Sequence, residues 1–239
     1  MFLTSRAIVL NKVRHTDTTF ITTLYTEQAG SVAFVVKMPR SAKTRLKVQL
    51  LQPLALLTVE WDHRPASNLQ RLHDVQIEAP YSSLTSQPER APLASLLSEA
   101  LHHALSYEHQ GEVYPFIHRS LTAIDHLSGD AANAHLVFLL QLARQLGIAP
   151  APFSMVNGQR YFDLLNAEYT ATQPEHKYYL NHQDARRIPL MLRLTYPTMH
   201  RVRLTPSQRQ RALTIILTYY RLHIPGFPKL RSADILAQL

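Results

Sequence analysis

The chain has 239 residues, of which 46% are hydrophobic and 18% are charged, and its formal net charge is +8. This balance excludes a disordered chain, and the absence of cysteine excludes disulfides, thiolate nucleophiles, iron–sulfur clusters and every cysteine-containing zinc site. The sequence shows no signal-peptide pattern and no apolar stretch approaching about 18 residues, so we expect a cytoplasmic protein without a membrane span.

The first 80 residues predict a small β-barrel. Val32, Phe34 and Val36 alternate with more exposed positions, as in a strand with one buried face. Runs rich in β-branched and aromatic residues occupy residues 6–13, 18–26, 31–37, 50–62 and 69–77. Five short strands and a basic connection at residues 38–47 match the OB barrel, whose groove binds single-stranded nucleic acid. We therefore expect residues 1–80 to form an OB-fold nucleic-acid-binding domain.

Beyond this segment the pattern becomes helical. Prolines among Ser and Thr at residues 80–92 indicate a linker, and the spacing of apolar residues then changes from two to about 3.6. We expect residues 81–239 to form a helical domain, so that the fold class is α+β. Its first helices are predicted at residues 93–104, 113–127 and 131–146, the last of them ended by Gly147.

The rest of the helical domain holds one strong helix signal. Thr205, Pro206 and Gln208 supply an N-cap, a first-turn proline and a capping-box partner, predicting a helix that runs to about His223. Ser232 is expected to cap a short final helix. Residues 161–163 and 168–170 predict a small hairpin or loop inserted in this domain.

Positive charge gathers in two zones of the sequence. Residues 186–231 hold ten basic side chains and no acidic one, and residues 37–47 hold five basic side chains and no acidic one. Two such zones favour a polyanionic partner, first nucleic acid and second an acidic protein tail. The alternative is that residues 81–185, with ten acidic and five basic side chains, fold against these zones and neutralise them.

We assign DNA binding to cations of the expected barrel and to two of its aromatic residues. The cations are Arg6, Lys12, Arg14, Lys37, Arg40, Lys43, Arg45 and Lys47. Tyr25 and Trp61 are the candidate base-stacking residues, with packing in the core as the alternative. Phe34, on the alternating face, is expected in the core.

The sequence holds no recognisable catalytic motif. Its six glycines are too far apart for a phosphate-binding loop or a nucleophile elbow. His102, His103 and His109 lie close in sequence but lack the spacing of a metal site, and the acidic residues form no nuclease-like grouping. We therefore expect no enzyme activity, no cofactor and no bound metal.

Several segments, taken in order, resemble the RecO family of bacterial recombination mediators. These are RAIVL at residues 6–10, LYTE at 24–27 before Gly30, Val36 and Lys37 with Arg40, LQPL at 51–54, LQRL at 69–72, YYRLHI at 219–224 and LRS at 230–232. YPTMH at residues 196–200 and IPGF at residues 224–227 further resemble the Bacteroidetes-like version of the family. The resemblance covers nearly the whole chain.

This resemblance implies an N-terminal OB domain, a C-terminal helical domain and a nucleoid-associated protein. It implies binding to single- and double-stranded DNA, annealing of complementary strands without ATP, a complex with RecR, and contact with the acidic C-terminal tail of single-stranded DNA-binding protein. Many family members carry a four-cysteine zinc module in the second domain, and this chain has no cysteine. We therefore expect residues 153–170 to be its metal-free counterpart.

We place the acidic-tail site in the helical domain, where arginines are expected to flank an apolar pocket. They are Arg144, Arg209, Arg211 and Arg221. The alternative function is a protein-interaction scaffold whose basic surface binds acidic partners.

Overall fold

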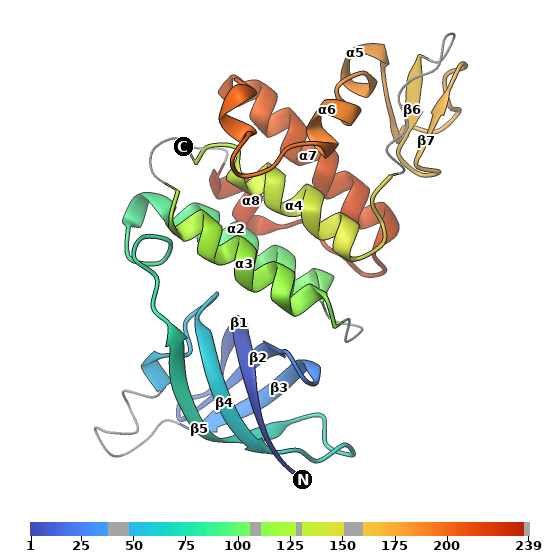
Figure 1. Cartoon of the computed structure of the whole chain (residues 1–239). Helices are drawn as coiled ribbons and strands as arrows, with labels where there is room; N and C mark the ends of the chain where they lie inside the picture. The colour runs from blue at the N-terminus through green and yellow to red at the C-terminus, as the bar shows by residue number, and fades with distance from the viewer. Residues whose placement is uncertain (38–47, 106–110, 128–130, 151–159, 237–239) are drawn as a thin grey trace. The chain divides into compact units, whose positions relative to one another are not determined.

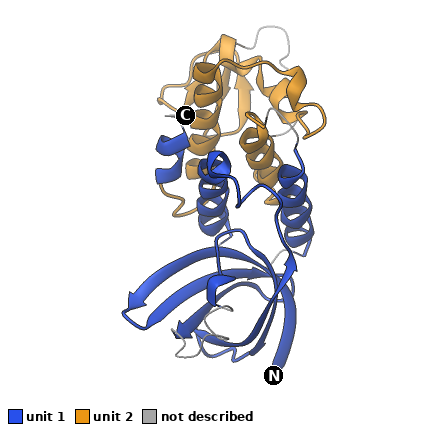
Figure 2. Ribbon diagram, turned by 90° about the vertical axis from the view of Figure 1, so that its left-hand side faces the viewer, with its two compact units in different colours: residues 1–127, 230–239 blue, residues 128–229 orange. Residues whose placement is uncertain are grey.

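The computed structural model describes residues 1–37, 48–105, 111–127, 131–150 and 160–236 (Figure 1). The chain forms two compact units (Figure 2). Unit 1 comprises residues 1–127 and 230–239, and unit 2 comprises residues 128–229. The domain boundary expected near residue 80 stays a prediction.

Unit 1 contains a closed five-stranded barrel, which confirms the expected OB-like fold. Its strands are β1 (Phe2–Thr16), β2 (Thr19–Thr26), β3 (Gly30–Lys37), β4 (Leu56–Asp62) and β5 (Gln70–Ala79). They follow the order β1-β2-β3-β5-β4, and β1 also pairs with β4 to close the barrel. All pairings are antiparallel except that of β3 with β5, which joins Phe34 to Gln70 and Val35 to Arg71.

The barrel core follows the predicted alternation. Val32, Phe34 and Val36 are buried, and the Phe34 ring meets the Trp61 ring edge-on at 5.7 Å between centroids. Strand β4 begins at Leu56, later than the start of the run expected at residues 50–62. Pro53 cannot donate to a strand ladder and Leu54 has a φ of 68°, so the chain turns there before the strand begins.

The longer helices in the described part of unit 1 are α2 (Ala91–Ala104), α3 (Val113–Asp125) and α8 (Arg231–Leu236). A short 3-10 turn, η1 (Pro88–Arg90), precedes α2. The Glu99 carboxylate of α2 accepts hydrogen bonds from the backbone N–H groups of Arg231 and Ser232, at 3.0 and 2.9 Å. Ser232 lies inside α8 and its hydroxyl donates to Glu99, so the expected N-cap role of Ser232 is wrong.

Unit 2 combines helices with a small sheet. The helical elements are α4 (Ala134–Gln145), α5 (His182–Ala185), α6 (Ile188–Leu192), η2 (Met199–Arg201) and α7 (Pro206–His223). The predicted capping box opens α7, because Thr205 Oγ1 accepts from the Gln208 N–H at 3.2 Å and Gln208 Oε1 accepts from the Thr205 N–H at 3.0 Å.

Residues 161–163 and 168–170, expected to form a hairpin or a loop, are paired strands of a small sheet in unit 2 that also has a third strand. β6 (Tyr161–Asp163) pairs with β7 (Glu168–Thr170) and with β8 (Tyr179–Leu180). Residues 153–159, the first part of the expected metal-free counterpart of the zinc module, lie outside the described residues. Within the ranges that the structure describes, no helix combines the length and the apolar character needed to cross a membrane.

Candidate nucleic-acid interface and apolar pocket

The two aromatic residues proposed to stack on bases are core residues. Tyr25 and Trp61 both have 0% exposed surface. Trp61 lies in the barrel core with Phe34, and its Nε1 donates to His63 Nδ1 at 3.3 Å. Tyr25 of β2 pairs in the sheet with Ile8 of β1, which is also fully buried. A base cannot reach either ring, so the stacking role predicted for these two residues is wrong.

Arg6 is engaged within unit 1. Its Nε donates to Glu27 at 2.8 Å, its Nη1 lies 3.6 Å from a Glu78 carboxylate oxygen, and its guanidinium lies 5.3 Å from the centre of the Tyr114 ring. The hydrogen bond with Glu27 raises the pKa of Arg6, and the same bond lowers the pKa of the Glu27 carboxyl. Because two carboxylates balance its charge, we leave Arg6 out of the interface proposed below.

Lys12 and Arg14 lie towards the end of β1. The Lys12 ammonium donates to the Val48 carbonyl at 3.1 Å and lies 5.1 Å from the centre of the Phe20 ring, and burial lowers its pKa. Arg14 forms an ion pair with Asp17 at 2.9 Å, and the two side chains are 64% and 98% exposed. Such an exposed pair is weak, so Arg14 can exchange Asp17 for another anion.

Two exposed cations on adjacent strands form what we call the barrel strip, Lys37 of β3 and Arg71 of β5. Arg71 pairs in the parallel register with Val35, two residues before Lys37. Neither side chain forms an ion pair with any carboxylate among the described residues. Arg71 is isolated in the sequence, so charge clustering missed it, whereas strand alternation after the buried Gln70 would have placed it outside.

The other four cations assigned to DNA lie outside the described residues. They are Arg40, Lys43, Arg45 and Lys47.

Unit 2 presents a group of five arginines that we call the unit 2 arginine group. They are Arg186, Arg187, Arg193, Arg201 and Arg203. Arg187 is half-buried and the other four are exposed. Across the part of the chain that the structure describes, no carboxylate forms an ion pair with any of them. Neutralisation by the acidic middle segment is therefore not seen for these five side chains.

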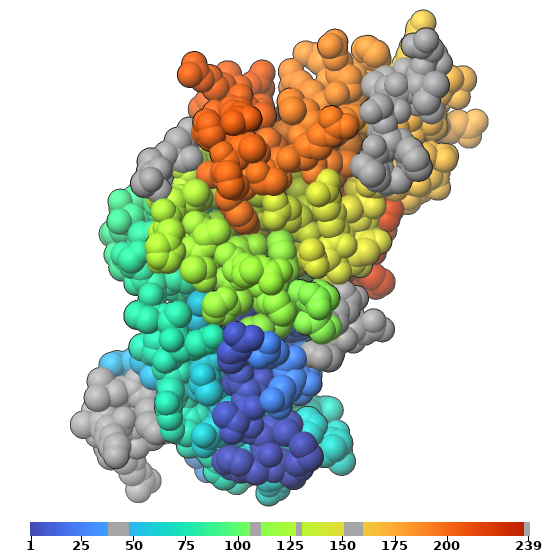
Figure 3. Space-filling view, viewed as in Figure 1, coloured from blue at the N-terminus to red at the C-terminus, as the bar shows by residue number. Residues whose placement is uncertain are grey.

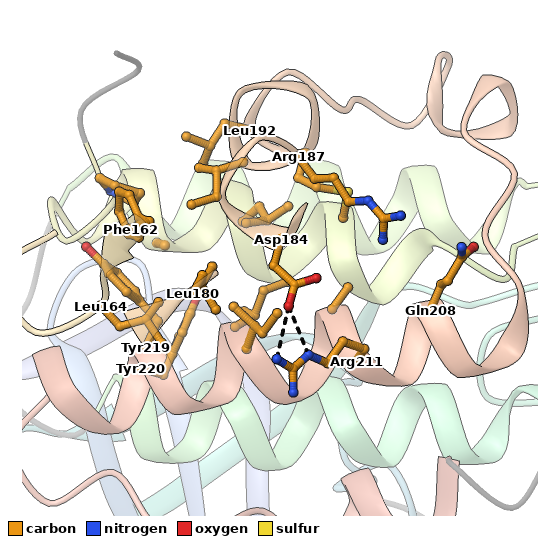
Figure 4. A pocket seen from close by; sticks show the side chains of 18 of the residues that line it. Phe162, Leu164, Leu180, Asp184, Arg187, Leu192, Gln208, Arg211, Tyr219 and Tyr220 are labelled. Atoms are coloured by element: carbon orange, nitrogen blue, oxygen red, sulfur yellow. Dashed lines mark hydrogen bonds and ion pairs between the residues drawn. The ribbon is translucent and has the colours of Figure 1, made fainter. Parts of the chain in front are cut away.

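Unit 2 also contains a pocket of about 110 Å³ with a largely apolar lining. Side chains from α4, the small sheet, α6 and α7 supply the apolar surface, as Figure 4 shows for Phe162, Leu180 and Tyr220. Its polar lining residues are Asp184, Arg187, Gln208 and Arg211. One Asp184 oxygen accepts from Nε and Nη2 of Arg211 at 3.3 and 3.0 Å, whereas Arg187 has no carboxylate partner among the described residues (Figure 4).

Of the four arginines expected to flank this pocket, Arg211 is found in its described lining and the other three are not. Arg144 donates to the Leu192 carbonyl, Arg209 to the Leu204 carbonyl at 3.4 Å, and Arg221 to the Thr218 hydroxyl at 3.4 Å. Arg187 was not singled out from the sequence because the short helices around it give no periodic signal.

The histidines do not form a metal site in the described part of the chain. No group of three or more His, Asp or Glu side chains there is arranged to hold a metal ion. His102 and His103 lie with ring centroids 5.0 Å apart, and burial, followed by the charge of His103, lowers the pKa of His102. His109 lies outside the described residues.

Comparison with known protein families gives a match for the N-terminal part of the chain and another for the C-terminal part. Residues 1–81 match the family model described as recombination protein O N terminal, and residues 85–232 match the model described as recombination protein O C terminal. The DNA repair protein RecO of Phocaeicola vulgatus is 37% identical over 233 residues, covering 97% of this chain and 96% of that protein. The DNA repair protein RecO of Bacteroides fragilis is 38% identical over 234 residues, with the same coverage. That of Porphyromonas gingivalis is 29% identical over 246 residues, covering 100% of this chain and 99% of that protein. The chain therefore belongs to the recombination protein O (RecO) family.

Proposed function

We propose that this chain is a DNA repair and recombination mediator that binds single- and double-stranded DNA and anneals complementary strands without ATP. The observation that carries the proposal is the unit 2 arginine group, five cations without a carboxylate partner in the described part of the chain. Unbalanced guanidinium groups on a protein surface bind phosphates well, because each one can donate two hydrogen bonds at once. Relatives of similar length are named DNA repair proteins, which supports the same reading.

The proposed mechanism is charge neutralisation. The barrel strip on unit 1 holds the phosphate backbone of one strand, and the unit 2 arginine group holds a second. With both backbones neutralised, the repulsion that keeps two strands apart falls, and base pairing supplies the free energy of annealing. This process needs no catalytic group and no nucleotide.

The pocket of unit 2 is proposed to bind the acidic C-terminal tail of single-stranded DNA-binding protein. Its apolar lining suits an apolar or aromatic side chain, and Arg187 at the pocket suits a carboxylate. Such a contact would bring the mediator to coated DNA, where it acts with RecR as the family resemblance implies.

A salt series on the full chain tests DNA binding and annealing together. If about five phosphates of a single strand are neutralised, affinity falls on the order of a hundredfold between about 50 and 200 mM salt. An affinity that does not change with salt would refute the mechanism. Strand annealing by the purified chain also separates this proposal from an interaction scaffold, which would bind acidic proteins and leave the annealing rate at that of free DNA.

Paired variants locate the two surfaces. The double variant K37A/R71A is expected to weaken binding to all DNA sequences about equally and to make the salt dependence shallower, because two phosphate contacts are lost. Arg71→Ala alone has a matched control in Arg119→Ala, since each removes one exposed arginine from the same unit. Equal effects of Arg119→Ala and Arg71→Ala would mean that net charge, and not the barrel strip, governs binding.

A peptide titration tests the pocket. A labelled peptide with acidic residues and a C-terminal phenylalanine is titrated against the full chain and against Arg187→Ala. We expect Arg187→Ala to weaken binding about tenfold and Arg221→Ala, outside the described lining, to leave it unchanged. The same peptide with a C-terminal amide distinguishes recognition of the terminal carboxylate from general attraction to acidic residues. Unaltered binding to Arg187→Ala would place the tail elsewhere.

A further inference from the structure

The barrel carries an exposed pair of rings, Phe2 and His73. Phe2 lies at the start of β1, where it pairs with Asp62 of β4 in the sheet. Its side chain is nevertheless 58% exposed. His73 is exposed on β5, and the two ring centroids lie 5.6 Å apart at an interplanar angle of 45°. A single exposed aromatic residue is common on protein surfaces, but contact with a second ring restricts the orientations of the exposed ring.

The ring pair continues the barrel strip. His73 follows Arg71 by two residues on β5, and Lys37 follows Val35 by two residues on β3. Because Val35 and Arg71 are paired in a parallel register, Lys37 and His73 lie equally far beyond this pair on adjacent strands. At the end of the barrel where Phe2 lies, Figure 3 shows the blue residues of β1 next to the cyan residues that follow β4.

Carboxylates near the ring pair are engaged by neighbours. Asp62, which pairs with Phe2 in the sheet, accepts from Arg64 Nε at 3.2 Å. Asp74, which follows His73, accepts from Gln76 Nε2 at 3.2 Å. Lys37 and Arg71 have no carboxylate partner among the described residues, so these two cations are free to bind phosphate. The ring pair thus adds an exposed aromatic face to the strand that carries Arg71. Aromatic faces and cations together are the means by which proteins hold unpaired nucleotides.

We propose that Phe2, supported by His73, stacks on an unpaired base of a single strand whose phosphates are held by Lys37 and Arg71. This inference rests on the DNA binding proposed above and names the group that distinguishes single-stranded from double-stranded DNA. In a duplex each base lies between its neighbours, so the Phe2 ring has no free base face to contact. The strip therefore binds both forms through phosphate, and the ring pair adds affinity for unpaired DNA alone.

Substitutions of Phe2 in the full chain test the proposal. Binding of a labelled thymidine oligonucleotide and of a duplex of equal length is measured by fluorescence anisotropy at several salt concentrations. Phe2→Ala is expected to weaken oligonucleotide binding about tenfold, to leave duplex binding unchanged, and to leave the salt slope unchanged because stacking involves no counterion. Phe2→Trp is expected to restore binding, whereas Phe2→Leu, apolar without a ring, is expected to resemble Phe2→Ala.

Ile77→Ala is the matched control, because Ile77 is also an exposed apolar residue of the barrel, at 50% exposure. The buried Trp61 is the only tryptophan, so its fluorescence reports whether each variant other than Phe2→Trp retains the folded barrel. For Phe2→Trp, circular dichroism serves instead.

Three outcomes would overturn the stacking role: equal losses for oligonucleotide and duplex, full binding by Phe2→Ala, or restoration by Phe2→Leu. If K37A/R71A still loses affinity in those cases, the proposed DNA binding stands and only the stacking role fails. If the unsubstituted chain binds neither form, the proposed function itself fails.

Discussion

Asp125, the last residue of α3, is predicted to be a major source of stability in unit 1. Its carboxylate is buried and accepts hydrogen bonds from the chain that follows β5. Oδ2 accepts from the backbone N–H and the hydroxyl of Ser82, both at 2.8 Å. Oδ1 accepts from the N–H groups of Ser83 and Leu84 at 2.8 and 2.6 Å, and from the Ser83 hydroxyl at 3.1 Å. This one side chain therefore fixes three successive residues to α3.

Asp125→Asn retains the shape of the side chain and removes its charge. The amide keeps one acceptor oxygen and replaces the other with an NH2 donor. If the oxygen takes the position of Oδ1, the NH2 group takes the position of Oδ2 and faces the Ser82 N–H, which is also a donor. The Ser82 hydroxyl can turn to accept, but its backbone N–H cannot. Losing one or two hydrogen bonds to a charged group, at about 1.5–3 kcal/mol each, predicts a decrease of about 3 kcal/mol in the free energy of unfolding.

The pH dependence identifies the cause. Burial alone would raise the pKa of Asp125, and backbone hydrogen bonds from Leu84, Ser82 and Ser83 outweigh it and hold the pKa well below its usual range. A carboxyl with a depressed folded pKa stabilises the protein above its unfolded pKa of about 3.9, and this stabilisation declines as pH falls towards the folded pKa. The difference between the unsubstituted chain and Asp125→Asn should therefore be about 1 kcal/mol smaller at pH 3 than at pH 6.

Urea unfolding followed by Trp61 fluorescence measures both quantities, because the only tryptophan is buried in the barrel of unit 1. Asp17→Asn is the control, since the Asp17 side chain is 98% exposed and its removal should change stability little. A loss below about 1 kcal/mol at pH 6, or a difference that stays constant between pH 6 and pH 3, would refute the assignment.

Three further outcomes follow from other contacts. Trp61→Phe should lower the free energy of unfolding of the barrel by about 1–3 kcal/mol and leave DNA affinity unchanged, because the ring is buried. A folded variant with weaker DNA binding would mean that Trp61 contacts DNA after all. Glu99→Ala removes the acceptor for the first turn of α8, so amide hydrogen exchange at residues 231–236 should become at least tenfold faster, whereas unchanged exchange would contradict the contact. Tyr220→Phe deletes a buried hydroxyl that donates to the Leu139 carbonyl at 2.7 Å, so thermal unfolding should show a loss of about 1 kcal/mol, and no loss would mean the bond contributes nothing.

Local patterns in the sequence were sufficient to predict the longer strands and helices of the fold. The alternation of Val32, Phe34 and Val36 predicted β3, and the sequence from Thr205 to Gln208 predicted the start of α7. By contrast, α5 (His182–Ala185) and α6 (Ile188–Leu192) were not predicted, because four or five residues are too few to show a helical period. These two short helices carry Asp184 and help to line the pocket, so the pocket could not be assembled from the sequence.

The candidate interface was harder to predict because a cation's partner is often distant in sequence. Arg6 and Glu27 are 21 positions apart and meet only because β1 and β2 pair. The burial of the aromatic residues was also hard to predict, because either face of a strand can be covered by other parts of the fold. Tyr25 and Trp61 are buried, whereas Phe2, at the start of β1, is exposed. Residue type predicted that cationic and aromatic side chains would form the interface. Pairing across the sheet determined which of these side chains are exposed and free to contact DNA.

Unit 1 is made from two separate stretches of the chain, with the whole of unit 2 encoded between them. A ribosome therefore completes residues 128–229 before it reaches α8, and until then the Glu99 carboxylate lacks the N–H groups of Arg231 and Ser232. Premature termination just before residue 230 would consequently leave unit 1, whose synthesis begins first, without its last helix, while unit 2 would keep all of its residues.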